Sequence, residues 1–464
     1  MTDLRQWLPL AVDAVDAWMS QFGPQEEHPS LRVDDERLAQ AFHELSDRLQ
    51  DNYPFGSPRY VGQMLKPPHP AAVLGYVTAM LINPNNHALD GGPATAQMEK
   101  EVVADLASMF GMPTHMGHLT SSGTIANLEA LWAARETHPG KSIAYSADAH
   151  YTHSRMCGVL GVTGVSVATD SAGRMDLNDL DRVLDAHDIG TVVATLGTTG
   201  LGAIDPLPEI LERTQARGVR VHVDTAYGGF FTLIADDSAD GVASAPFAAI
   251  TRADSIVVDP HKHGLQPYGC GAVLFADPAV GRFYLHDSPY TYFSSDELHL
   301  GEISLECSRA GAAAAALWLT TRVLPLTDAG LGQVLRACRR GALDWARRLD
   351  ASKELTPFQE PALDIVTYFP THQRMSEIDA ASRDLFTDAA SLPSAERIDL
   401  ATYLVDESGF RTRGHMVDSD VPRARIMRST VMKPESADAI KEIETTLESL
   451  VSSRAAAPVP DGPH

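Results

Sequence analysis

The sequence of 464 residues contains few cysteines and no long apolar run. Its four cysteines lie far apart and form no Cys-x-x-Cys pair, so neither a zinc ribbon nor a disulfide framework is indicated. No stretch approaches the roughly 18 apolar residues that cross a bilayer. Residues 1–21 also lack the basic start and unbroken apolar core of a signal peptide. The sequence therefore predicts a cytoplasmic protein without a metal site or a membrane partner.

Basic residues are scarce as well. Lys and Arg number 37 against 61 Asp and Glu, which leaves a net charge of −24. Such a surface repels phosphate backbones, so nucleic acid is not an expected partner. No Gly-x-Gly-x-x-Gly or Gly-x-Ser-x-Gly stands at a suitable turn, and Arg135 occupies the place of the first Walker glycine before Gly140. Nucleotide binding and esterase chemistry therefore have no motif to support them.

Short apolar runs alternate with helical patterns from about Ala94 onward. The runs are rich in Val and Ile, and helical stretches such as Ile125–Thr137 and Leu207–Arg217 separate several of them. This alternation is typical of an α/β protein with a mainly parallel sheet covered on both faces. The predicted strands are Ser142–Tyr145, Val165–Ala168, Thr191–Leu196, Val219–Val223, Ser255–Val258 and Ala272–Phe275.

Both ends of the chain differ from this central pattern. Residues 4–19 carry apolar side chains at helical spacing, with a broad apolar face that needs a surface to pack on. Pro325 ends the pattern after an Ala-rich helix, and a more polar, mixed segment follows. We therefore expect an N-terminal helical segment (1–55), a large α/β domain (56–324), a small C-terminal α+β domain (325–451) and a flexible tail (452–464).

The first candidate site is the segment Ser122-Gly123-Thr124, which directly precedes a predicted helix. Small residues at a helix start leave backbone N–H groups and the positive end of the helix dipole open, which suits a phosphate group. An ordinary Ser/Thr N-cap would explain the same residues.

The second candidate is the end of the strand Val219–Val223. Alternation along the strand places Asp224 and Ala226 on one face. The carboxyl ends of strands are where open α/β sheets bind ligands, and a carboxylate there can keep a ring nitrogen protonated. A capping Asp before a glycine turn is the simpler alternative.

The third candidate is Lys262, which follows the apolar strand Ser255–Val258. Burial beside such a strand can keep an amine nucleophilic, although most lysines are ordinary surface residues. His261 and His263 flank Lys262 and could suggest a metal pair, but no matching third ligand is evident.

These three segments occur in one order, with Ala149-His150 and the stretch Thr195–Thr199 between them. Together they resemble the group II pyridoxal-phosphate (PLP) amino-acid decarboxylases, and the resemblance extends over about residues 58–319. Residues 57–60 and 85–95 look most like the bacterial tyrosine and valine decarboxylase branch. The resemblance implies the PLP-dependent transferase fold of type I, with a mainly parallel seven-stranded sheet in the large domain.

The resemblance also implies roles for individual residues. Lys262 would hold PLP through its amine, Asp224 would pair with the pyridine nitrogen, and His150 would stack on the ring. Each role has a physical reason, because a dianion needs N–H donors, a pyridinium needs a carboxylate and a flat ring needs a flat neighbour. The other expected cofactor contacts are Ser122, Gly123, Thr124 and His261 at the phosphate, Ala226 beneath the ring and Thr198 beside the cofactor.

The proton donor and the substrate pocket are less closely defined. By position, Tyr268 corresponds to a catalytic tyrosine of the tyrosine decarboxylase branch, whereas Tyr290 and Tyr292 are rivals on a segment that resembles the family's mobile loop. Any of the three could equally serve in packing. His263 departs from the relatives, which usually carry Trp or Met there. The expected substrate contacts are Gln63, Met64 and Leu65, with Asn85 and His87 from a partner subunit.

The sequence thus predicts a PLP-dependent L-amino-acid decarboxylase that forms the amine and CO2, with an aromatic or aliphatic substrate. A homodimer with its active site at the subunit interface is expected, because the N-terminal apolar helix needs a surface and the family's sites lie between subunits. Two alternatives keep PLP: decarboxylation coupled to oxidative deamination, and another carbon–carbon lyase reaction. A catalytically idle subunit with the same fold is the alternative from a different class.

Overall fold

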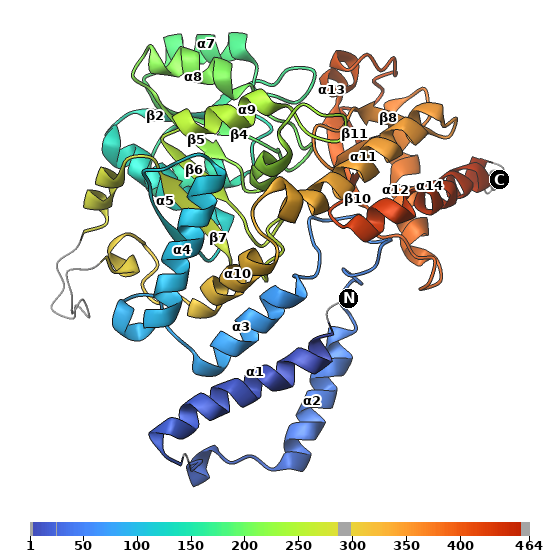
Figure 1. The fold of residues 1–464 in the computed structure, drawn as a ribbon. Coiled ribbons are helices and arrows are strands. Elements are labelled where there is room, and N and C mark those ends of the chain that lie inside the picture. The colour runs from blue at the N-terminus through green and yellow to red at the C-terminus, as the bar shows by residue number, and fades with distance from the viewer. Residues whose placement is uncertain (1–2, 25, 286–297, 456–464) are drawn as a thin grey trace.

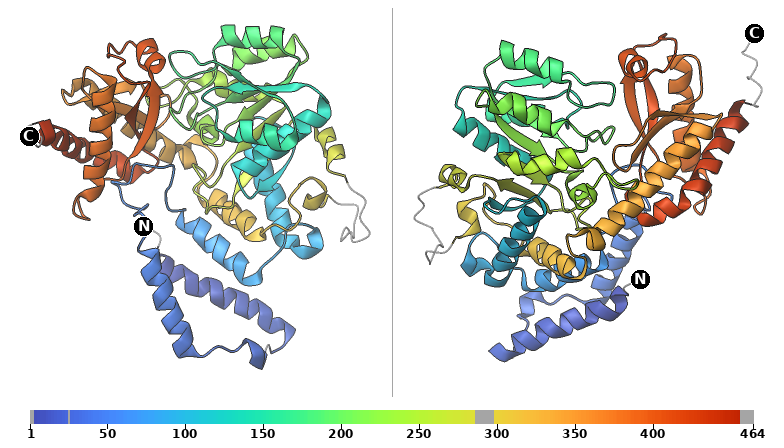
Figure 2. Two further views of the ribbon diagram at one scale, coloured as in Figure 1. Left: turned by 180° about the vertical axis from the view of Figure 1, so that it is seen from behind. Right: turned by 45° about the horizontal axis from the view of Figure 1, so that its top comes forward.

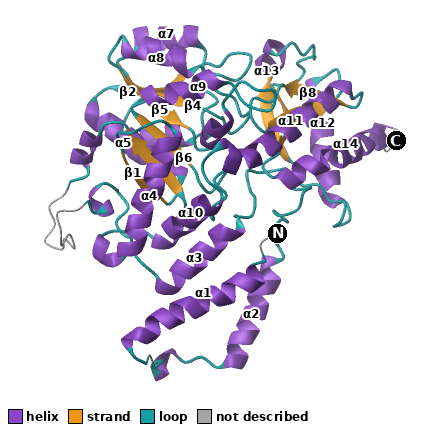
Figure 3. Cartoon of the chain, viewed as in Figure 1, coloured by secondary structure: helices purple, strands orange, loops and turns teal. Residues whose placement is uncertain are grey.

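The computed structural model describes residues 3–24, 26–285 and 298–455. The strands gather in two separate sheets, each covered by helices, and the first helices extend away from both (Figures 1 and 3). Within the described part of the chain, no helix is long and apolar enough to cross a membrane.

The larger sheet has seven strands in the order β1-β7-β6-β5-β4-β2-β3. Strands β2 to β6 pair in parallel, and β7 is antiparallel to both β6 and β1. This confirms the predicted mainly parallel, seven-stranded sheet. The strands are β1 (Met116–Thr120), β2 (Ser142–Ser146), β3 (Gly164–Val167), β4 (Ile189–Thr195), β5 (Arg220–Asp224), β6 (Ser255–Val258) and β7 (Gly271–Phe275).

Helices cover both faces of this sheet. On one face lie α4 (Pro93–Met109), α7 (Leu177–Ala186) and α8 (Leu207–Gln215), and on the other lie α5 (Gly123–Thr137) and α6 (Thr152–Leu160). Because side chains alternate along a strand, Val192 and Ala194 of β4 join the first core while Val193 packs with α5 and α6. The last residue of β5 has the parity of this second face, so its side chain lies toward α5 and α6.

The smaller sheet is antiparallel, in the order β10-β11-β9-β8. Its strands are β8 (Leu355–Gln359), β9 (Ile365–Pro370), β10 (Ala401–Asp406) and β11 (Arg423–Thr430), and the accompanying helices are α11 (Gln333–Ala351), α12 (Met375–Ser391), α13 (Glu407–Thr412) and α14 (Pro434–Ala455). Helices α11, α12 and α14 share one core with this sheet. Helix α14 extends to Ala455, so residues 452–455 lie in its last turn.

The N-terminal helices form an extension that projects from the rest of the chain in each view (Figure 2). It consists of α1 (Leu4–Met19) and α2 (Asp35–Leu49). Helix α1 packs on α3 (Pro70–Ile82), which in turn packs on α10 (Gly311–Val323). A further short helix, α9 (Ser244–Ala248), lies between β5 and β6 in the sequence. Helix α2 has no buried residue, so its apolar side chains face solvent in the single chain.

The proline-rich segment between α2 and α3 is irregular, as its composition predicts. It is anchored to the smaller sheet, because the N–H of Val61 donates to the carbonyl of Asp399 and the N–H of Thr430 donates to the carbonyl of Val61. Residues 63–65 therefore lie where the two sheets meet.

The core of the smaller sheet gives a direct test of the fold. Trp345 of α11 is fully buried and its ring centroid lies 5.4 Å from that of Tyr368. Trp345→Ala should lower the free energy of unfolding by about 3–5 kcal/mol, because it opens a cavity that the core cannot refill. Urea denaturation measures this change. Met416→Ala removes a side chain that is 92% exposed and should cost less than about 0.5 kcal/mol, so equal effects would contradict the structure.

Candidate active site

A cavity of about 260 Å³ lies at the carboxyl ends of β4, β5 and β6, against the start of α5. Parallel strands end at one edge of a sheet, which is why residues far apart in the sequence meet there. Nine of the residues singled out in the sequence line this cavity: Ser122, Gly123, Thr124, His150, Asp224, Ala226, His261, Lys262 and Tyr268.

Lys262 follows β6 in a tight turn. Its Nζ lies 3.1 Å from Oδ2 of Asp259, and its side chain is 19% exposed. Gly123 at the start of α5 permits this arrangement, because a Cβ there would stand 2.5 Å from Oδ2 of Asp259. Asp259 Oδ1 has no hydrogen-bond partner within the described residues. The amine is therefore held at the cavity by a buried carboxylate, next to an open helix end.

The start of α5 supplies several hydrogen-bond donors. Ser122 is the N-cap, and its Oγ accepts the backbone N–H of Ile125 at 3.3 Å. The N–H groups of Gly123 and Thr124 belong to the first helical turn, which has no helical acceptors. His261 lies beside them, with Nδ1 2.8 Å from the carbonyl of Cys270, and burial lowers the pKa of its imidazole. The N–H groups of this first turn suit a phosphate group.

Asp224 ends β5 with its carboxylate buried between the sheet and α6. Oδ1 accepts the N–H of Ala226 at 3.0 Å, and Oδ2 lies 2.9 Å from Nε2 of His153. Burial by itself would raise the pKa of Asp224, but the hydrogen bonds from His153 and Ala226 outweigh it and hold the pKa below its ordinary value. Asp224 is therefore an anion at neutral pH.

His153 is a residue that the sequence analysis missed. The available signal was its spacing, since it follows His150 by three residues at the start of a helix. Nothing in that spacing indicates a contact with β5, because the partner Asp224 is 71 residues further along the chain.

His150 presents its imidazole to the same cavity. Its Nδ1 accepts the N–H of Thr152 at 3.2 Å and lies 2.8 Å from the Thr152 hydroxyl. Burial is the main cause that lowers the pKa of His150, so the ring is neutral and flat at neutral pH. Tyr151 packs against it with ring centroids 4.2 Å apart. These contacts fix the orientation of the imidazole.

Thr198 is buried, and its hydroxyl accepts the N–H of Ala203 at 3.0 Å within the turn after β4. It does not appear among the residues that line the cavity, whereas its neighbours Thr195, Gly197 and Thr199 do. Thr195 Oγ1 is buried and has no hydrogen-bond partner in the described part of the chain. The hydroxyl of Thr195, at the end of β4, is therefore available to bond a ligand in the cavity.

Tyr268 stands at the mouth of the cavity, more than half exposed. Its hydroxyl donates to the carbonyl of Met64 at 3.4 Å, and its ring lies 4.7 Å from that of His261. Burial of part of the ring is the main cause that raises the pKa of Tyr268, so the phenol keeps its proton at neutral pH. This contact places Met64 beside Tyr268, but Gln63, Met64 and Leu65 are not among the residues that line the cavity. Tyr290 and Tyr292 lie outside the described residues.

Asn85 and His87 do not line this chain's own cavity. The side-chain carbonyl of Asn85 accepts the N–H groups of His87 and Arg309, and its amide donates to Ser308. The two residues thus lie against the segment that precedes α10. Their predicted contact with substrate requires a second subunit.

His263 points away from the cavity, toward the smaller sheet. Its Nε2 lies 3.2 Å from Oδ2 of Asp364, while Oδ1 of Asp364 accepts the hydroxyl of Tyr227 at 2.6 Å. All three side chains are buried. His261 and His263 therefore face different partners and do not form a metal-binding pair.

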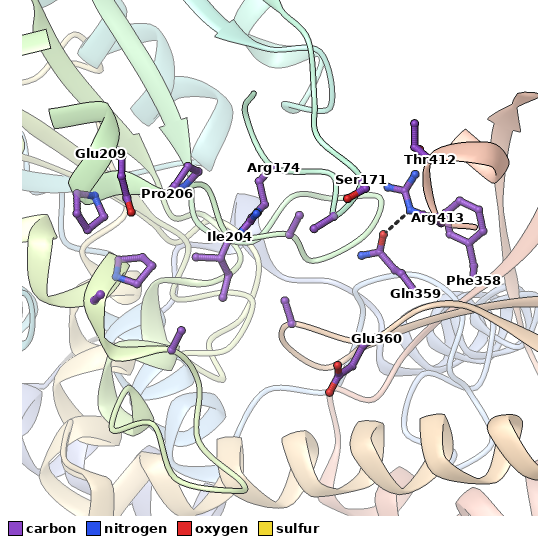
Figure 4. A pocket seen from close by; sticks show the side chains of 17 residues that line it. Ser171, Arg174, Ile204, Pro206, Glu209, Phe358, Gln359, Glu360, Thr412 and Arg413 are labelled. Atoms are coloured by element: carbon purple, nitrogen blue, oxygen red, sulfur yellow. Dashed lines mark hydrogen bonds between the residues drawn. The ribbon is translucent and has the colours of Figure 1, made fainter. Parts of the chain in front are cut away.

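A second cavity, of about 670 Å³, lies between the two sheets (Figure 4). None of the residues singled out in the sequence lines it. Its arginines are already engaged, because Arg413 donates to Gln359 at 2.9 Å and Arg174 pairs with Asp170 at 2.7 Å. The chemistry of the chain therefore belongs to the smaller cavity.

The smaller cavity fits PLP group by group. Phosphate would bind the first turn of α5, the ring nitrogen would face Asp224, and the amine of Lys262 would hold the aldehyde carbon. The flat His150 and the small Ala226 leave a slot for a ring, since neither carries a branched side chain.

Several known proteins are similar to this chain in sequence or in fold. The L-tyrosine decarboxylase of Enterococcus faecium is 28% identical over 459 residues, covering 76% of this chain and 75% of that protein. The L-aspartate decarboxylase of Thermococcus kodakarensis is 27% identical, covering 71% of this chain and 84% of that protein. Mouse CSAD has the same fold, with a TM-score of 0.79, 22% identity and 92% of each chain covered. For Oryza sativa TDC solved with PLP and tryptamine, the TM-score is 0.78 at 18% identity, with 97% of this chain and 98% of that one covered.

The family model described as the pyridoxal-dependent decarboxylase conserved domain matches residues 32–368, which include every strand of the larger sheet. This match favours decarboxylation over the other PLP reactions. The meeting of Lys262, Asp224 and His150 in one cavity speaks against an idle subunit. The chain therefore belongs to the pyridoxal-dependent decarboxylase family and is a PLP-dependent amino-acid carboxy-lyase.

Proposed function

We propose that the enzyme decarboxylates a neutral aromatic L-amino acid, with L-tyrosine as the leading candidate. The observation that carries this proposal is the charge of the cavity. Lys262 is the sole Lys or Arg among the described residues that line it, and His150 and His261 both have lowered pKa values. A substrate with a carboxylate side chain would need a cation there. The likeness to tyrosine decarboxylases points the same way.

PLP, when bound, supplies an electron-withdrawing ring that accepts the electron pair left as CO2 departs. The residues of the chain prepare this step. The anionic Asp224 would hold a proton at the ring nitrogen, and the first turn of α5 would bind the phosphate so that the ring cannot slide. Lys262 would hold the cofactor through its amine. His150 covers one side of the slot and excludes water.

Tyr268 is the proposed donor of the proton that replaces CO2 on the substrate Cα. It stands at the mouth of the cavity that contains Lys262, and its phenol is protonated at neutral pH because partial burial raises its pKa. The contact with the carbonyl of Met64 holds the hydroxyl at the entrance. A positioned acid of this kind typically contributes 10²–10⁴-fold to a rate.

The exposed face of α2 supports a homodimer. Leu38, Phe42, Leu45 and Leu49 recur at helical spacing and are each more than half exposed. An apolar face of this length marks an interaction site, and each such side chain contributes about 1.5–3 kcal/mol when fully buried. A second copy of the chain is the proposed cover, because it would also bring Asn85 and His87 toward the neighbouring cavity.

The proposal also places the enzyme in a reducing cytoplasm. Cys157, Cys270 and Cys338 are buried free thiols, and Cys307 is exposed and free. Unpaired thiols of this kind are typical of proteins in a compartment that keeps cysteines reduced.

The first prediction concerns the reaction itself. The purified enzyme supplied with PLP should release CO2 and tyramine from L-tyrosine, and Lys262→Ala should lower this rate by about three orders of magnitude or more. Each of the twenty amino acids is assayed in parallel for CO2 and amine. Faster turnover of L-aspartate than of any aromatic amino acid would contradict the proposed substrate, and unchanged turnover by Lys262→Ala would contradict the site.

The second prediction concerns the proton donor. Tyr268→Phe should still bind PLP and still release CO2, but amine should form roughly 10²–10⁴-fold more slowly. The decarboxylated substrate should instead be diverted to aldehyde with dioxygen as the oxidant. Chromatography of amine and aldehyde measures the ratio. Tyr290→Phe and Tyr292→Phe are the matched controls, and aldehyde from either of these with normal amine from Tyr268→Phe would assign the donor to one of them.

The third prediction concerns assembly. Light scattering should give the wild-type enzyme a mass of twice 50.0 kDa, and the double variant Leu38→Asp/Phe42→Asp should shift it toward the single-chain mass, because two carboxylates cannot be buried in an apolar interface. Met416→Asp places a carboxylate at a site that is already exposed and should leave the mass unchanged. A wild-type enzyme that is monomeric would contradict the dimer.

A further inference from the structure

The environment of His153 is unusual for a histidine without a direct place in the cavity. The side chain is fully buried in the first turn of α6, with Nε2 2.9 Å from Oδ2 of Asp224. Its ring stacks on Tyr145 of β2 with centroids 6.2 Å apart. It is therefore fixed behind the carboxylate, on the side away from the cofactor slot.

The second ring nitrogen of His153 shows which tautomer is present. Nδ1 is buried and has no hydrogen-bond partner within the described residues. A proton on Nδ1 would be a buried donor without an acceptor, which is costly. A proton on Nε2 instead points at the carboxylate of Asp224. The tautomer with its proton on Nε2 is thus favoured over the Nδ1–H tautomer, and this N–H donates to Asp224.

Among the described residues packed around the pair, three ionisable side chains are neutral. His222 of β5 bonds Ser255 and Asn127 through its two nitrogens, and burial lowers its pKa to about 3. Burial raises the pKa of Tyr145 and takes that of Cys157 to about 11, so both are neutral. The remaining ionisable neighbours are His150, Lys262 and Asp259 across the cavity and Arg220 beside Asp254.

We propose that His153 is a positioning residue, which donates through Nε2 to the Asp224 carboxylate and so holds it toward the cofactor ring. The proposal rests on the role proposed for Asp224. With Oδ2 held by His153 and Oδ1 by the N–H of Ala226, the carboxylate keeps one orientation and lines the cavity. Loss of the His153 donor would let the carboxylate turn, so the ring nitrogen would lose electrostatic stabilisation. Cofactor affinity should therefore fall when this donor is removed.

The experiment measures the dissociation constant of PLP by equilibrium dialysis and by the visible absorbance of the bound cofactor. His153→Leu removes the donor and should raise the constant about 10- to 100-fold, the value of one hydrogen bond to a charged group. His153→Gln keeps an N–H donor and should retain most of the wild-type affinity.

A matched control separates this effect from simple loss of stability. His118 and Glu129 form another fully buried histidine–carboxylate contact, at 3.0 Å, and neither residue lines the cavity. His118→Leu should lower the melting temperature without changing the dissociation constant of PLP. A His118→Leu enzyme that binds PLP as weakly as His153→Leu would overturn the proposal.

Asp224→Asn distinguishes failure of this inference from failure of the site. If Asp224→Asn binds PLP as tightly as the wild type, the role proposed for Asp224 is wrong. If Asp224→Asn weakens binding while His153→Leu does not, the inference on His153 is wrong and the site remains. If His153→Leu does not fold, His153→Phe decides, because it keeps a ring beside Tyr145 without a donor, and wild-type affinity for PLP in that variant would overturn the proposal.

Discussion

A buried carboxylate at the end of β5 is the constraint on which the site depends. Asp224 must stay ionised away from water, which is costly unless donors surround it. The structure meets this need with the N–H of Ala226 on one oxygen and His153 on the other. The carboxylate can then face a cofactor nitrogen because the parity of β5 directs it toward α5 and α6. The role proposed for Asp224 therefore depends on the solvation of its carboxylate by protein groups.

Close approach between backbone segments is the second requirement. Gly123 lets the carboxylate of Asp259 reach the start of α5 and so places Lys262 beside the donors of that helix. Gly197, with φ +102°, lets the turn after β4 pass Gly228, where a Cβ would stand 2.9 Å from the Gly228 nitrogen. The small residues around the cavity thus bring three strand ends within reach of one ligand.

The smaller sheet contributes by fixing the walls of the cavity. Arg428 of β11 donates through Nε to the carbonyls of Thr199 and Gly200, at 2.9 and 3.1 Å. Asp364 accepts the hydroxyl of Tyr227, which follows β5, and contacts Nε2 of His263, which follows β6. The turns around the cavity are therefore held from behind by buried polar contacts, and the exposed apolar face of α2 has no cover in the single chain.

The sequence by itself determined the fold class, the family and the residues of the cofactor motifs, because strand alternation and helix starts depend on residues that are neighbours in the sequence. Six of the seven strands of the larger sheet followed from apolar runs, whereas β1 did not, since Met116–Thr120 contains Gly and His in place of a Val/Ile run. Only the tertiary structure decided which partners meet. It brings His153 into contact with Asp224, directs the Thr198 hydroxyl to the N–H of Ala203 within its own turn and places Thr195 at the cavity. Contacts of this kind depend on how helices pack across a sheet, and a pattern of neighbouring residues does not predict which distant residues meet there.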